Sequence, residues 1–185
     1  MRYYYAAIEG MVDPQVGRIL KALGAKGLLD NTIVLLAADH GDFMGQHRLV
    51  RKGMFLYDAL LHVPMLWRVP GMKGGRRTKV LTRGIDIFPT LADLTGGTLP
   101  RELPGRSLKS VFAGPEPDET GRAIFTSAAY GELPRELVEK NKDSSADPET
   151  PLHSLAEERS SRPENRYSMI RTRDWKFLLS ESRAP

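Results

Sequence analysis

Asp30-Asn-Thr-Ile-Val-Leu-Leu-Ala-Ala-Asp-His-Gly-Asp42 is the stretch that decides the fold. Its segment from Thr32 to Ala38 is an unbroken apolar run with β-forming residues at its start. Such a run is typical of a strand that is buried on both faces of a parallel sheet. Polar residues and a glycine follow at once. We therefore expect Asp39 and His40 at the carboxyl end of a strand, the edge where open α/β sheets bind ligands.

A helix is predicted before this strand. Apolar residues recur there at helical spacing, namely Val12, Val16, Ile19, Leu20 and Leu23. We expect Asp13 to cap the helix and Pro14 to occupy its first turn, where proline lacks only an amide that the helix would not use. We expect the helix to end at Gly24 or Gly27.

The pattern continues with further short elements after the first strand. A helix with Pro89 in its first turn is expected from Ile85 to Leu94, ended by Gly96 and Gly97. The expected strands are 64–69, 78–82, 123–127, 167–171 and 176–179. Between the late strands, residues 131–165 are polar and poor in apolar side chains, which predicts a mobile loop.

Composition excludes several classes of protein. The formal charge of +4 comes from 27 Lys and Arg against 23 Asp and Glu, and it is dispersed in short clusters, so we expect no nucleic-acid partner. The chain has no cysteine and hence no disulfide or thiolate site. No apolar run approaches the roughly 18 residues of a membrane span, and the first residues lack the apolar core of a signal peptide. The sequence does not determine the compartment of the protein. Without a signal peptide, the chain as it stands is expected to be cytoplasmic.

The residues from Asp39 to Lys52 are the candidate site. A carboxylate and an imidazole side by side at a strand end can hold one divalent cation. Lys52 follows Asp39 by thirteen positions and can return to offer a positive charge to a sulfate or phosphate group. Each residue also has an ordinary structural role open to it: Asp39 as a cap, His40 as a turn residue and Lys52 as a solvated surface lysine.

The wider pattern resembles the sulfatase family of the alkaline phosphatase superfamily. The blocks that carry the resemblance, in order, are 12–20, 30–47 with Lys52, 62–71, 81–96 with 104–108, and 169–177. The resemblance implies an α/β fold, with part of an alkaline-phosphatase-like, mostly parallel sheet and flanking helices in residues 1–114. It further implies a small antiparallel sheet in residues 115–185.

The resemblance also implies roles for individual residues. Asp39 and His40 match a pair of metal ligands, usually around Ca²⁺, and Lys52 matches the lysine that binds the sulfate oxygens. His47 stands in the family's Gly-x-His turn, where it contacts the substrate or packs behind the site. Asp42 is expected to be a loop acid, and His62 to be structural.

The chain departs from the family in one essential feature. Nothing in it matches the Cys-x-Pro-x-Arg or Ser-x-Pro-x-Arg segment whose first residue becomes the formylglycine nucleophile. We therefore expect a fragment truncated at both ends and inactive by itself, whose partner is the missing N-terminal half or a second copy bound through exposed core. The predicted function of the parent is sulfate ester hydrolysis. The alternatives are phosphodiester or phosphonate ester hydrolysis and a non-catalytic remnant that binds an anion or a protein.

Overall fold

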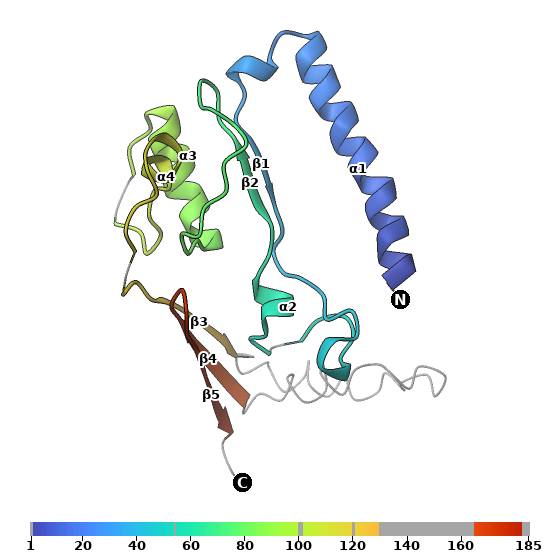
Figure 1. Ribbon diagram of the computed structural model, residues 1–185, viewed down its shortest axis with the longest axis vertical. Helices are drawn as coiled ribbons and strands as arrows, with labels where there is room; N and C mark the ends of the chain where they lie inside the picture. The colour runs from blue at the N-terminus through green and yellow to red at the C-terminus, as the bar shows by residue number, and fades with distance from the viewer. Residues whose placement is uncertain (1, 54, 100–101, 120, 130–164, 183–185) are drawn as a thin grey trace, which may run out of the picture.

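The computed structural model describes residues 2–53, 55–99, 102–119, 121–129 and 165–182. Its helices are α1 (Arg2–Ala25), α2 (Asp58–Leu61), α3 (Ile87–Thr95) and α4 (Lys109–Ala113), with short 3-10 turns at Leu29–Asn31, Gln46–Arg48 and Gly84–Asp86. Its strands are β1 (Val34–Ala37), β2 (Met65–Arg68), β3 (Ile124–Ala129), β4 (Asn165–Arg171) and β5 (Lys176–Ser182). In Figure 1 the β1–β2 ribbon runs between α1 on one side and α3 with α4 on the other, and β3–β5 lie beyond α2.

The strand that the apolar run predicts is present, and its partner strand runs in the opposite direction. β1 pairs antiparallel with β2 in a two-stranded sheet, with Leu36 opposite Leu66. The predicted α/β class is confirmed, whereas the expected parallel partners of β1 are not found among the described residues. An apolar run shows that a strand suits burial on both faces, but it carries no information about the direction of the neighbouring strand.

Helix α1 begins earlier than the sequence predicts and ends where it predicts. The helix starts at Arg2, so Asp13 is not its cap and Pro14 lies inside it. The expectation was wrong: the fixed φ angle of proline is compatible with a helix, and α1 continues through Pro14 although proline there removes one backbone hydrogen bond and crowds the carbonyl four residues earlier. At the other end Gly27 has a φ of 66°, and the amides of Leu28 and Gly27 bond to the carbonyls of Leu23 and Gly24. This pair of bonds is the Schellman motif.

A buried carboxylate organises the region around α3. Asp86 is 0% exposed and accepts hydrogen bonds from the Arg83 amide at 2.9 Å and the Arg106 amide at 3.0 Å. The Arg83 guanidinium adds a third bond at 3.2 Å. Beside it, a Cβ on Gly105 would lie 1.9 Å from the Ile85 carbonyl oxygen, so only glycine fits there. Asp86 therefore joins α3 to the segment that leads into α4.

The strand predicted at residues 78–82 is absent, and this expectation was wrong. Carboxylates take the place of a neighbouring strand as acceptors for the amides of this segment. The Lys79 amide donates to Glu116 Oε1 at 2.6 Å, and the Leu81 amide donates to Glu119 Oε2 at 3.2 Å. The Lys79 amide also holds the pKa of Glu116 below its usual range.

The last third forms the antiparallel sheet that was predicted. Its strands lie in the order β3-β4-β5, and both pairs are antiparallel. The loop predicted for residues 131–165 lies outside the described residues, apart from Asn165, which begins β4. The division of the chain at residue 114 stays a prediction.

Large apolar side chains are exposed on several elements. On the β1–β2 ribbon the opposed Leu36 and Leu66 are 48% and 57% exposed. Further examples are Met11, Val12 and Ile19 on α1, Phe88 on α3, and Phe125 and Phe177 in the late sheet. No helix within the described ranges is long and apolar enough to cross a membrane. Contiguous exposed apolar surface marks an interface or a site of association, and the opposed Leu36 and Leu66 are the candidates for it here.

We expect the chain to bind a hydrophobic dye or to self-associate as its concentration rises. The double variant Leu36→Thr and Leu66→Thr should weaken both effects, because threonine keeps the strand propensity and removes apolar surface. Leu28→Thr, on an exposed turn, is the matched control. Dye fluorescence and sedimentation measure the two properties. A dye-silent monomer at all concentrations would contradict the expectation.

Candidate metal and anion site

Gly41 fixes the backbone at the carboxyl end of β1. Its amide donates to the Leu60 carbonyl at 2.9 Å, which ties the segment after β1 to helix α2. A Cβ on Gly41 would lie 2.0 Å from the Ala59 carbonyl oxygen. Any side chain at this position would push α2 away. Glycine is therefore required by the close approach of two backbones, and this contact places Asp39 and His40 just before it.

The three residues predicted for the site lie together. His40 Nδ1 is 2.8 Å from the Gly41 carbonyl oxygen, and a carbonyl can only accept, so Nδ1 carries the proton. The lone pair of the neutral ring is then on Nε2. That atom lies 3.8 Å from Asp39 Oδ2 and 3.3 Å from Lys52 Nζ. A carboxylate, an imidazole lone pair and an ammonium group thus share one exposed location.

Asp39 is held in its ionised form. Its Oδ1 accepts a hydrogen bond from the His40 amide at 3.0 Å. This bond is the largest cause that lowers the pKa of Asp39, followed by a bond from its own amide; the charge of a protonated His40 ring would lower it further, and the charge of Lys52 does so more weakly. The Asp39 side chain is 89% exposed. Its second oxygen, Oδ2, therefore remains accessible for a cation.

Asp39 and His40 fit a single divalent cation. Two ligand atoms that each lie about 2.0–2.6 Å from one ion must lie within roughly 5 Å of each other, and Asp39 Oδ2 and His40 Nε2 meet this condition at 3.8 Å. The hydrogen bond from Nδ1 to a backbone carbonyl is the usual support of a metal-bound histidine, because it fixes the ring and the tautomer. Across the described part of the chain, no group of three or more His, Asp or Glu residues is placed to hold a metal.

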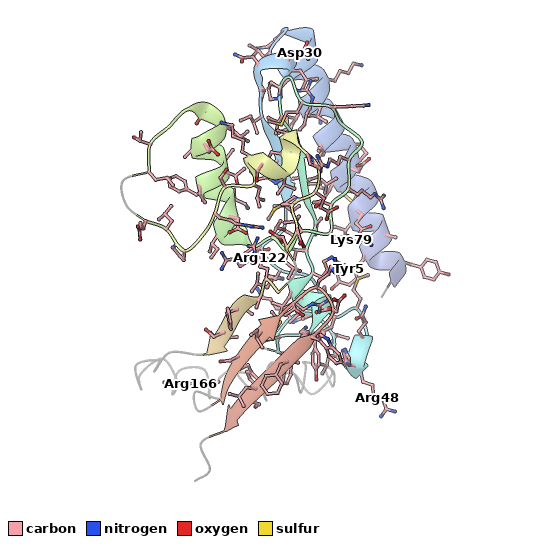
Figure 2. The ribbon with its side chains drawn as sticks, turned by 60° about the vertical axis from the view of Figure 1, so that its left-hand side comes forward. Tyr5, Asp30, Arg48, Lys79, Arg122 and Arg166 are labelled. Carbon is pink, nitrogen blue, oxygen red and sulfur yellow. The ribbon has the colours of Figure 1, made fainter. Side chains whose placement is uncertain are left out.

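His47 packs on an aromatic ring. Its imidazole stacks on Tyr57 with centroids 4.2 Å apart and an interplanar angle of 17°. The loop around it is strained, since Met44, His47, Arg48 and Arg51 all have positive φ angles. In Figure 2, Arg48 projects from the outer side of this loop. The predicted contact of His47 with substrate stays a prediction.

Asp42 is bonded within its loop as expected of a loop acid, whereas the structural role expected of His62 stays a prediction. The Asp42 oxygens accept hydrogen bonds from the Tyr5 hydroxyl at 2.6 Å and the Met44 amide at 2.7 Å. Asp42 is therefore a loop acid that also anchors α1, whose Tyr5 end Figure 2 shows beside this region. His62 is exposed at the end of α2, and its amide donates to Asp58. Tyr5 escaped the sequence analysis, because a pairing over 37 positions leaves no local pattern.

Comparison with known proteins shows similarity to one protein family. The family model described as Sulfatase matches residues 1–97. Arylsulfatase K of Canis lupus familiaris is 38% identical over 108 residues, which are 58% of this chain and 20% of that protein. Delta 4,5-hexuronate-2-O-sulfatase of Bacteroides thetaiotaomicron is 40% identical over 119 residues, 61% of this chain and 25% of that protein. The chain thus spans a quarter or less of each of these relatives.

A solved structure shares the fold over most of the chain. The phosphonate monoester hydrolase of Agrobacterium radiobacter superposes with a TM-score of 0.69 and is 30% identical. The match covers 91% of this chain and 30% of that protein.

We expect Tyr5→Phe to loosen the loop after β1. The change keeps the ring and removes the hydroxyl that donates to a carboxylate, a bond that contributes about 1–2 kcal/mol. The free energy of unfolding and hydrogen exchange at residues 42–44 measure the effect. Tyr3→Phe is the matched control, because Tyr3 lies on the same helix and is 92% exposed. Equal behaviour of the two variants would refute a role for this hydrogen bond.

Proposed function

The chain belongs to the sulfatase family, and we propose that it supplies two metal ligands and the sulfate-binding lysine of an enzyme that hydrolyses sulfate esters. The observation that carries the proposal is the convergence on His40 Nε2, with Asp39 Oδ2 at 3.8 Å and Lys52 Nζ at 3.3 Å. Asp39 and His40 would hold the cation, for which we propose Ca²⁺. Lys52 would contact the oxygens of the sulfate group.

The chemistry follows from the charges of these groups. A bound divalent cation polarises a sulfuryl oxygen and stabilises the charge that develops on it. Asp39 brings the negative charge that attracts the cation, and the Gly41 carbonyl keeps the His40 ring turned for ligation. One Nε2 lone pair cannot serve a cation and the Lys52 ammonium at once. Ligation at His40 would therefore free Lys52 to bind the anion.

The nucleophile belongs to the proposed remainder of the enzyme. We propose that a formylglycine outside these 185 residues would supply the nucleophile, as a hydroxyl of its hydrated form, as the resemblance to the family implies. The partner of this chain would then be the polypeptide that bears the formylglycine. The exposed apolar side chains of the β1–β2 ribbon and α1 offer the surface for such a partner.

Hydrolysis of phosphonate esters is the second candidate function. It is favoured by the 30% identity with the phosphonate monoester hydrolase of Agrobacterium radiobacter over most of this chain. A lysine and a divalent cation serve a phosphoryl group as well as a sulfuryl group, so the three residues alone do not separate the two reactions.

The metal site is tested on the chain itself with Mn²⁺, whose paramagnetism broadens the NMR signals of nearby residues. We expect broadening at Asp39 and His40. In Asp39→Asn the affinity for Mn²⁺ should fall by about tenfold or more, because one of the two protein ligands loses its charge. Asp13→Asn, on the exposed side of α1, should bind like the unaltered chain. Unchanged Mn²⁺ affinity in Asp39→Asn would remove Asp39 from the site.

The reaction is tested in an enzyme completed with a formylglycine-bearing sulfatase half. We expect turnover of an aryl sulfate, with the same assay run on an aryl phosphonate monoester to score the second function. Lys52→Ala should lower turnover by about 10²–10³ while Mn²⁺ affinity is retained, since it removes one contact with the developing charge. Lys73→Ala, in an exposed loop, is the control. Full turnover in Lys52→Ala would refute its role, and no turnover of either ester would favour a non-catalytic binding function.

A further inference from the structure

One carboxylate joins helix α2 to both strands of the β4–β5 hairpin. Asp58, the first residue of α2, accepts a hydrogen bond from Lys176 Nζ at 2.6 Å. Its other oxygen lies 3.1 Å from the guanidinium of Arg171. Arg171 ends β4, Lys176 begins β5, and the two residues are partners in the strand register. The hairpin therefore presents two cations at one end, and Asp58 pairs with both.

An aromatic contact supports the same junction. The ring of Phe55, just before α2, meets the ring of Tyr167 on β4 edge to face, with centroids 5.5 Å apart. Phe55 also contacts Tyr57, on which His47 stacks. Two independent contacts thus hold the α2 region against the late sheet, which Figure 1 shows on the far side of α2 from the β1–β2 ribbon.

The opposite end of α2 holds the candidate metal ligand. The Leu60 carbonyl accepts the Gly41 amide at 2.9 Å, and the Ala59 carbonyl fills the space that a Gly41 side chain would need. The Gly41 carbonyl in turn accepts His40 Nδ1 at 2.8 Å. The orientation of the His40 ring therefore depends on the backbone of Gly41, whose amide bonds to α2 and whose carbonyl accepts the ring N–H.

We propose that Asp58 is a positioning residue for His40: its bonds to Lys176 and Arg171 fix α2, and α2 holds the backbone of Gly41, whose carbonyl orients the imidazole. The significance of this role rests on the proposed function, in which His40 binds the cation. The hydrogen bond from Lys176 is the largest cause that holds the pKa of Asp58 below its ordinary value of 3.8, so Asp58 is ionised at neutral pH.

If the ion pairs of Asp58 only stabilised the surface, a different result would be expected. Exposed ion pairs usually contribute little to stability and do not alter a remote side chain. Asp93 and Lys109 provide such a pair at 3.0 Å, joining α3 to α4 away from α2. Asp93→Asn is therefore the matched control for Asp58→Asn.

The experiment compares the full chain with Asp58→Asn, Lys176→Met and Asp93→Asn by NMR. Hydrogen exchange of the Gly41 amide reports its bond to Leu60. The ring nitrogen shifts of His40 at about pH 8, above the ordinary histidine pKa, report which nitrogen carries the proton. We expect Asp58→Asn and Lys176→Met to lower Gly41 protection by about tenfold and to mix the two His40 tautomers. Asp93→Asn should leave both readouts unchanged.

Several outcomes would overturn the proposal. Unaltered Gly41 exchange and His40 shifts in Asp58→Asn and Lys176→Met would do so, as would an equal change in Asp93→Asn. If Asp58→Asn fails to fold, Lys176→Met decides the question, because it removes the bond from Lys176 on the sheet side and leaves the bond from Arg171 in place. Neither readout needs a metal. A chain that shows these changes but does not bind Mn²⁺ would refute the proposed metal site and support the positioning role.

Discussion

The contact between the Gly41 backbone and helix α2 is the constraint on which the site depends. The Gly41 amide reaches the Leu60 carbonyl, and the absence of a side chain lets the two backbones meet. On one side of this contact the chain continues back through His40 and Asp39 to β1. On the other side α2 leads to the late sheet through Asp58. Segments more than a hundred positions apart are thereby joined by a short series of hydrogen bonds.

Local patterns were enough to predict many of the elements. The apolar run predicted β1, Gly96 predicted the end of α3, and the late segments predicted short strands, because each of these signals lies within a few residues of the structure it causes. The antiparallel arrangement of the late strands came from the resemblance to the family. Local patterns failed where the deciding partner lies far away. The antiparallel direction of β2 relative to β1, and the carboxylates of Glu116 and Glu119 that replace a strand beside residues 78–82, have no local signature.

The residues of the candidate site could be predicted from the sequence, but the residues that hold them in place could not. The spacing of Asp39, His40 and Lys52 identified three residues that the structure does bring together. The groups that hold them were not predictable, since Tyr5 and Asp58 act across 37 and 118 positions. A tyrosine in a helix and an aspartate at a helix start are ordinary residues in a sequence. Their contribution is visible only when the loop and the sheet that they bind are folded beside them.

Asp86 and Asp39 show how burial separates a carboxylate that holds the fold together from one that is free to bind a ligand. Asp86 is 0% exposed and surrounded by donors, so both of its oxygens are committed and it can bind nothing further. Asp39 uses one oxygen for the His40 amide and leaves the other in solvent. A carboxylate oxygen that has no hydrogen-bond donor from the protein costs little free energy when water solvates it. The same oxygen would cost much more free energy if it were buried in the interior. The residues that set the geometry are therefore the paired ones. The residues proposed for the reaction stand where a cation and an anion can reach them.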